Sequence, residues 1–160
     1  MKVFVINCGS SSIKFKLFEA ETCEKRVVAD GYVENIGGEQ PNFVRRTEEN
    51  EVSRACAARN HDQAMAVIID SLVDNIEAGL RDIEEISCVG HRIVHGGDTS
   101  FRSIRITEDV IRKIEEYSRL APLHNPYNVS GIRAAMKFLP DALHVAVFDT
   151  AFHQTMPPHA

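Results

Sequence analysis

A serine-rich turn close to the start of the chain has the composition of a phosphate-binding loop. The apolar run at residues 3–6 is followed by Asn7, Cys8, Gly9 and three serines. Backbone N–H groups and small hydroxyl side chains in such a turn can form a concave anion site, and a nearby ammonium group adds positive charge. Most Gly/Ser turns bind nothing, so this stretch alone is a weak indication. The side chains that could take part are those of Asn7, Ser10, Ser12 and Lys14.

Arg92 and Val94 have the spacing of a site for a small carboxylic acid. They lie two residues apart in a predicted strand, so their side chains should share one face. A guanidinium fork fits a carboxylate, and a small apolar side chain beside it accommodates a short alkyl tail. A structural ion pair next to an ordinary core valine explains the same two residues, and on this ground alone it is favoured.

Asp149 and His124 are two further candidates. Asp149 ends an apolar segment, as do aspartates that position a metal ion or water in phosphoryl-transfer enzymes, although such a residue can also cap a turn. His124 lies in a loop between Pro122 and Pro126. Its imidazole could donate to an anionic transition state or simply bond to the backbone, and the spacing does not decide between these roles.

The histidines do not predict a metal centre. His91 and His95 form an H-x-x-x-H pattern, but the segment is predicted to be a strand, on which residues four apart lie about 13 Å from one another. The sequence also lacks the G-x-x-x-x-G-K-[ST] loop and a G-x-G-x-x-G turn after a strand. A P-loop protein and a dinucleotide-binding fold are therefore not expected.

Length and composition indicate one soluble globular domain. The chain has 160 residues, 44% of them hydrophobic, and a net charge of −5 without a basic block. A nucleic-acid partner or an anionic membrane surface is therefore not expected. We find neither a signal peptide nor a transmembrane segment, and the four cysteines form no C-x-x-C pair, so we expect reduced thiols in a cytoplasmic protein.

The hydrophobic periodicity predicts the elements that would position these side chains. Strands are expected at 3–6, 13–17, 27–34, 86–95 and 143–149, with a less distinct ribbon at 43–47 and 51–56. Helices are expected at about 62–80, after an N-cap at Thr107, and from Asn125 to Leu139. This order predicts an α/β fold in which helices pack on a mixed sheet. The ends of the first, fourth and fifth main strands should then converge on one cleft.

Four ordered blocks of the sequence resemble acetate kinases. They are VINCGSSSIK at residues 5–14, HRIVHGG at 91–97, APLHNP at 121–126, and VAVFDTAFHQTMP at 145–157. The resemblance covers the whole chain and implies a ribonuclease H-like, actin-like ATPase domain with a βββαβαβα core. It also implies reversible phosphoryl transfer from ATP to acetate, giving acetyl phosphate and ADP, with Mg²⁺ or Mn²⁺.

The resemblance implies a role for each candidate on the phosphate side. Asn7 would contact the transferring phosphoryl group and, together with Asp149, the metal ion. Ser10, Ser12 and Lys14 would lie in the phosphate loop. His124 would lie beside the reacting phosphate, and Asp149 would position the metal ion or the acid.

On the acid side, the resemblance implies that Arg92 binds the carboxylate. Val94 would line the methyl pocket, with Pro122 and Leu123 nearby and Phe152 closing it. The chain departs from the family at Tyr127, where a second proline is usual. We expect this position to lie in a loop, so the departure does not weaken the resemblance.

The family members are considerably longer than this chain. We therefore expect residues 1–160 to be the N-terminal acyl-substrate and phosphate-binding domain of a two-domain kinase. A C-terminal nucleotide-binding domain would be absent, and the chain alone would be inactive. The complete protein would be a homodimer.

Two alternatives remain open. One is a propionate kinase, against which Val94 argues because a smaller residue would leave room for a longer acyl chain. The other is a non-catalytic module that binds a small acid or phosphate.

Overall fold

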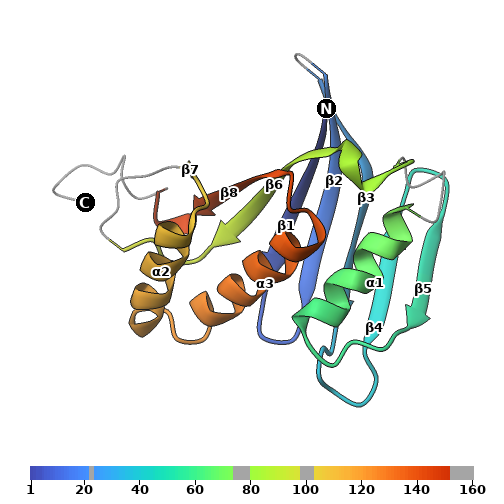
Figure 1. Ribbon diagram of the computed structural model, residues 1–160. Coiled ribbons are helices and arrows are strands. Elements are labelled where there is room, and N and C mark those ends of the chain that lie inside the picture. Colours follow the sequence, from blue (N-terminus) through green and yellow to red (C-terminus); the bar gives the residue numbers. More distant parts are fainter. Residues whose placement is uncertain (22–23, 74–79, 98–102, 152–160) are drawn as a thin grey trace, which may run out of the picture.

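In the described part of the chain, eight strands form one mixed sheet at the centre of the molecule (Figure 1). The structure, a computed structural model, describes residues 1–21, 24–73, 80–97 and 103–151. The strand order is β5-β4-β3-β2-β1-β6-β8-β7, in which β1, β6 and β8 are parallel neighbours and the other pairs are antiparallel. The strands are β1 (Lys2–Cys8), β2 (Ile13–Glu21), β3 (Glu24–Glu34), β4 (Asn42–Arg46), β5 (Glu51–Ala55), β6 (Ile86–Ile93), β7 (Ser103–Arg105) and β8 (Leu143–Phe148).

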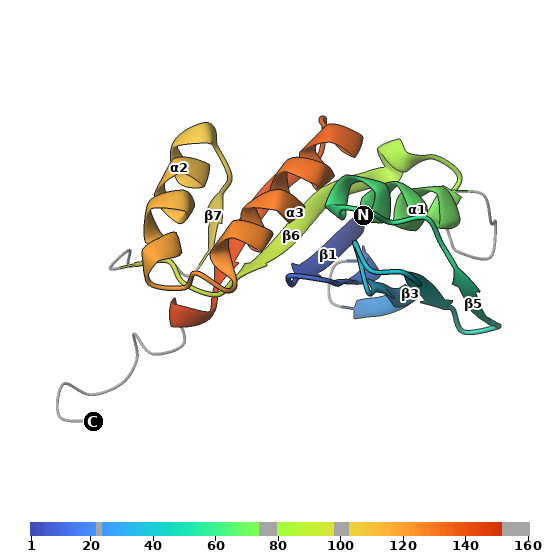
Figure 2. The ribbon, with the colours of Figure 1, turned by 90° about the horizontal axis from the view of Figure 1, so that it is seen from below.

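Helices α1 (His61–Val73), α2 (Glu108–Glu116) and α3 (Asn125–Phe138) lie on the same face of this sheet (Figures 1 and 2). Short 3₁₀ turns precede β6 (η2, Ile83–Glu85) and follow α2 (η3, Tyr117–Arg119). The Thr107 hydroxyl accepts a hydrogen bond from the Val110 N–H and so caps α2, as predicted. Within the described residues, no helix is both long and apolar enough to cross a membrane.

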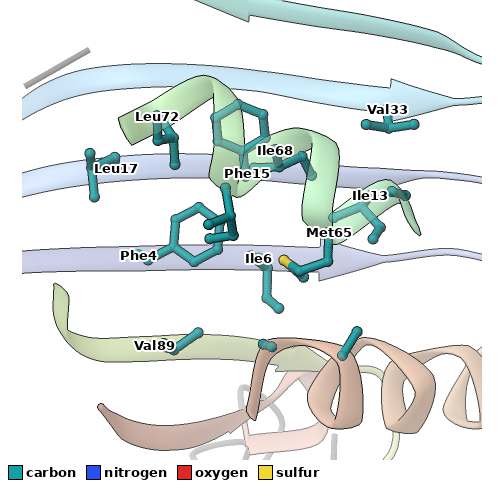
Figure 3. Close-up of a cluster of buried hydrophobic side chains, with 14 of the residues drawn as sticks. Phe4, Ile6, Ile13, Phe15, Leu17, Val33, Met65, Ile68, Leu72 and Val89 are labelled. Carbon is teal, nitrogen blue, oxygen red and sulfur yellow. The ribbon is translucent and has the colours of Figure 1, made fainter. Parts of the chain in front are cut away.

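The main core lies between α1, α3 and the centre of the sheet, and Figure 3 shows its central part. Period-two alternation in β2 buries Ile13, Phe15 and Leu17 and leaves Lys14 and Lys16 exposed on the opposite face. Burying a side chain of this size contributes about 1.5–3 kcal/mol, so the strand has one strongly favoured register. Lys14 is thereby fixed on the face opposite the described helices (Figure 1).

A second, smaller cluster attaches α2 and the middle of α3 to β6, β7 and β8. Its members are Ile93, Ile106, Ile111, Ile114, Val129, Ile132, Ala146 and Phe148. Between the two clusters, the parallel strands β1, β6 and β8 are held in register, with Ile6 opposite His91 and Arg92 opposite Val147. The carboxyl ends of these strands therefore meet at one edge.

The predicted mixed sheet and the ribbon at β4 and β5 are confirmed. The short strand β7 was not expected, because three residues with a single apolar side chain give no periodic signal. The helix predicted at about 62–80 is confirmed over the described residues of α1 (His61–Val73), Leu80 is not helical, and residues 74–79 lie outside the described part. The strand β6 ends at Ile93 and not at His95.

Side-chain hydrogen bonds explain the early end of β6. The backbone N–H of Val94 donates to Asn128 Oδ1, and that of His95 donates to Asn125 Oδ1, each at 3.2 Å. These donors are therefore directed to α3 and not to a neighbouring strand. Arg92 and Val94 consequently do not lie on one continuous strand face as predicted, since Val94 follows the strand in a bend.

Candidate active site

A cavity of about 250 Å³ lies where β1 and β6 end. Its lining comes from the serine turn, the end of β6 and the loop before α3, and consists of Asn7, Cys8, Gly9, Ser12, Lys14, Arg92, Val94 and His124. It adjoins a broader concavity of about 650 Å³ on the face opposite the described helices, and the two share Asn7, Ser12, Lys14 and Arg92. The fold thus brings together candidates from three separate parts of the sequence.

Arg92 forms a bidentate ion pair with Asp149, the residue that follows β8. Its Nε donates to both carboxylate oxygens at 3.1 and 3.0 Å, and its Nη2 donates to Oδ2 at 2.8 Å. This hydrogen bonding raises the pKa of the Arg92 guanidinium. The two side chains are 51% and 41% exposed, so solvent screens the pair and its contribution to stability is small. The main effect of the pair is to fix the direction of the guanidinium plane.

The serine turn is held by backbone and side-chain contacts. The Gly9 N–H donates to the Ser12 carbonyl at 2.8 Å and closes the turn. The Gly9 carbonyl accepts a hydrogen bond of 2.8 Å from Nε2 of His61, at the start of α1, and the His61 ring stacks on Tyr127 of α3. Asn7 pairs with Lys14 across β1 and β2. The turn is therefore attached to both α1 and α3.

Two asparagines at the start of α3 hold the ends of the strands. Asn128 Nδ2 donates to the Cys8 carbonyl at 2.8 Å, while its Oδ1 accepts from Val94. Asn125 Nδ2 donates to the carbonyls of His95 and Ile114 at 3.0 and 3.2 Å. Both asparagines are buried, and every one of these bonds spans separate elements.

Cys8 lines the cavity but is not suited to be a nucleophile. Burial raises the pKa of its thiol to about 12, so it stays protonated at neutral pH. Its sulfur lies against α3, where a Cβ on Gly131 would clash with Sγ. Cys8, Cys56 and Cys88 are free thiols, as expected, and Cys23 lies outside the described residues.

His91 and His95 have different hydrogen-bond partners. His91 Nε2 lies 2.9 Å from His144 Nδ1, and His144 Nε2 lies 2.8 Å from the Leu139 carbonyl. The Leu139 carbonyl can only accept, so His144 carries its proton on Nε2. The unprotonated Nδ1 of His144 therefore accepts a hydrogen bond from Nε2 of His91. His95 Nδ1 accepts from the Gly97 N–H at 2.9 Å.

The described residues contain no group of three or more His, Cys, Asp or Glu side chains that could hold a metal ion. Of the two expected metal ligands, Asn7 lines the cavity together with Arg92, whereas Asp149 contacts Arg92 but is not part of the lining. One carboxylate is nevertheless compatible with Mg²⁺, which keeps several waters and takes its other ligands from substrate phosphates.

Several predicted site residues do not belong to the described lining of this cavity. Ser10, Pro122 and Leu123 are exposed and do not belong to its lining; the Leu123 side chain is 74% exposed. Phe152 lies outside the described residues. Conversely, sequence reasoning missed His61 and Asn128, since a lone histidine at a helix start and an asparagine inside a helix carry no pattern.

Comparison with known proteins gives a consistent result. Residues 2–160 match the family described as the acetokinase family. The chain is 45% identical over its whole length to acetate kinase from Fervidobacterium nodosum and 47% identical to acetate kinase from Thermotoga maritima. It covers 39% of the length of each relative, so it spans about two fifths of the curated relatives that it matches.

Solved structures of related kinases superpose closely on this chain. The crystal structure of Porphyromonas gingivalis acetate kinase superposes with a TM-score of 0.92 at 43% identity, covering 99% of this chain and 40% of that one. A propionate kinase from Francisella tularensis superposes with a TM-score of 0.86 at 38% identity, over 99% of this chain and 39% of the other. These similarities confirm the predicted α/β fold of the actin-like, ribonuclease H-like class.

Proposed function

The chain belongs to the acetokinase family, and from this premise we propose that it forms the acid- and phosphate-binding side of an acetate kinase. The proposed reaction is reversible phosphoryl transfer between ATP and acetate, giving acetyl phosphate and ADP. The observation that supports it best is the cavity in which an oriented guanidinium, Arg92, faces the same space as Asn7, Ser12 and Lys14.

Arg92 would bind the acetate carboxylate. Asp149 engages Nε and Nη2, while Nη1 has no hydrogen-bond partner in the described part of the chain. A guanidinium can take a second carboxylate along its Nη1–Nη2 edge, so Asp149 would orient Arg92 without blocking it. Val94 lines the same cavity and would contact the methyl group. Phe152, Pro122 and Leu123 remain predictions for the rest of the acyl pocket.

The serine turn would hold the transferring phosphoryl group. Asn7, Ser12 and Lys14 line the same cavity as Arg92, so a phosphoryl group placed there would face the bound carboxylate. His124, from the loop before α3, could donate a hydrogen bond to the charge that develops on the phosphoryl oxygens. Ser10 would contribute through the backbone of the turn. Positioning and charge neutralisation are the main requirements of phosphoryl transfer.

A Mg²⁺ or Mn²⁺ ion would be held by Asp149, with Asn7 as a further candidate ligand. When bound, such an ion neutralises phosphate charge. The site needs further residues for the nucleotide, and we propose that a second domain of a longer protein supplies them. That domain would also carry the contacts of a homodimer, and we propose that the protein is cytoplasmic.

Propionate is a second candidate substrate, because one of the similar structures is a propionate kinase. Val94 favours acetate, since its two methyl groups would restrict the space for a longer acyl chain.

The test is a steady-state assay of the full-length protein with ATP, Mg²⁺ and acetate, in which hydroxylamine traps the acyl phosphate. We expect Arg92→Ala to raise the acetate KM and to lower kcat, because loss of charge-assisted hydrogen bonds costs about 1.5–3 kcal/mol. Arg92→Lys should recover only part of this loss, since an ammonium cannot bridge both carboxylate oxygens. Wild-type kinetics in both variants would make Arg92 a structural ion pair and would contradict the proposal.

A further inference from the structure

Asn128 connects the two sides of the proposed site. Its side-chain amide spans the gap between β1 and β6, with Nδ2 on the Cys8 carbonyl at 2.8 Å and Oδ1 on the Val94 N–H at 3.2 Å. Cys8 directly follows Asn7, and Val94 lies two residues after Arg92. The Asn128 amide thus bonds to the backbone next to Asn7, on the phosphate side of the site, and to the backbone near Arg92, on the acid side.

The environment makes this bridge rigid. Asn128 is only 3% exposed, so water does not compete for its two hydrogen bonds. It lies on the first turn of α3, and Gly131 on the next turn allows the helix to approach Cys8 closely. Packing fixes the same helix through Ile132 and Val129 of the smaller core cluster. The amide therefore has little freedom to tilt between the two strand ends.

We propose that Asn128 is a positioning residue that sets the separation between the phosphate turn and the Arg92 segment. This inference rests on the proposed function. In-line transfer needs the carboxylate oxygen and the phosphorus at a defined separation, and a displacement of about 1 Å can cost about 100-fold in rate. Asn128 does not line the cavity, so its loss should leave each half of the site able to bind and should disturb the relation between the halves.

The first test is Asn128→Ala in the full-length protein, assayed well below its melting temperature. We expect kcat to fall about 10- to 100-fold, while the KM values for acetate and ATP change much less. The matched control is Ile132→Ala, which removes a fully buried side chain of the same helix that contacts the smaller core cluster. It should lower the melting temperature while kcat changes little. If both variants lose melting temperature and both keep kcat, Asn128 is merely structural and the inference is wrong.

The second test is Asn128→Asp, measured as a pH profile of kcat. In its protonated form, the new carboxyl group would reproduce the amide, donating to the Cys8 carbonyl and accepting from the Val94 N–H, whereas its ionised form could not donate. We therefore expect kcat of this variant, relative to wild type, to increase as the pH is lowered. If the ratio of the kcat of this variant to that of wild type does not change with pH, the inference that Asn128 bridges the two strand ends is wrong.

The outcomes also separate this inference from the proposed function. An inactive wild-type protein would contradict the proposed function, and an active wild type with an equally active Asn128→Ala would contradict this inference alone.

Discussion

Arg92 and Asp149 illustrate how individual residues build this site. The pair is exposed enough for its electrostatic contribution to be small, yet its geometry is bidentate and directional. Sequence reasoning expected both residues at one cleft but did not predict that they form an ion pair with each other. The register that places Arg92 opposite Val147 and Ile93 opposite Phe148 brings them together.

Asp149→Asn tests whether this contact matters for function. The amide keeps the shape of the carboxylate but can accept through only one atom, so the bidentate grip on Arg92 is lost. We expect the acetate KM of the full-length protein to rise and kcat to fall by about tenfold or more. If Asp149 only caps the following turn, where asparagine serves as well as aspartate, the variant should retain both its melting temperature and wild-type kinetics.

Val94→Ala tests the acyl pocket. Removing two methyl groups enlarges the space beside Arg92, so propionate should fill a gap that acetate leaves. One methylene in an apolar pocket is worth about 1–3 kcal/mol, and the propionate-to-acetate ratio of kcat/KM should therefore rise about tenfold or more. Measuring both substrates on both proteins decides this. An unchanged ratio would mean that Val94 does not contact the acyl chain.

At the scale of elements, β6, β8 and the end of α3 are joined by a buried pair of neutral histidines. Burial, and to a lesser degree the neighbouring imidazole, lowers the pKa of His91 to about 3, and burial lowers the pKa of His144. The lowered pKa values favour neutral rings, and neutral rings fit the polar relay from His91 through His144 to the Leu139 carbonyl.

This pair predicts acid sensitivity. An unfolded histidine has a pKa near 6.5, so as the pH falls below that value the unfolded chain binds protons that the folded chain does not. Stability should be fully present above about pH 6.5 and should decrease toward pH 3, by about 1.4 kcal/mol per pH unit for His91. His144 should add to this decrease, because burial lowers its pKa as well.

Urea unfolding of the chain at several pH values would measure this decrease. The double variant His91→Gln and His144→Gln should show a flatter pH dependence, whereas the exposed His124→Gln should match wild type. Equal slopes in all three proteins would show that the histidine pair does not control the acid response.

Local patterns predicted most elements but fewer of the contacts between them. The alternation in β2 and the starts of α2 and α3 were readable because they depend on neighbours in the sequence. The strand β7 was too short to be periodic. His61 and Asn128 were missed because their partners, Gly9 and Cys8, lie 52 and 120 residues away. Such bonds follow from the packing of α1 and α3 on the sheet, which a local pattern does not contain.

At the scale of the whole molecule, the described helices cover one face of the sheet (Figure 2). The proposed site lies at the carboxyl ends of β1 and β6, beside the opposite face. This placement fits the general rule that ligands bind beyond the carboxyl ends of parallel strands. The chain spans about two fifths of its relatives, and we propose that residues outside it close the site over the nucleotide.

The most direct test is to compare this 160-residue chain with the full-length protein in one hydroxylamine-trapping assay containing ATP, acetate and Mg²⁺. We predict that the full-length protein forms acetyl phosphate and that the chain alone does not, because groups aimed at a transferring phosphoryl are each worth orders of magnitude in rate. Turnover by the chain alone at a rate comparable to that of the full-length protein would contradict the proposal that a second domain completes the site. Absence of acyl phosphate from the full-length protein would contradict the proposed reaction itself.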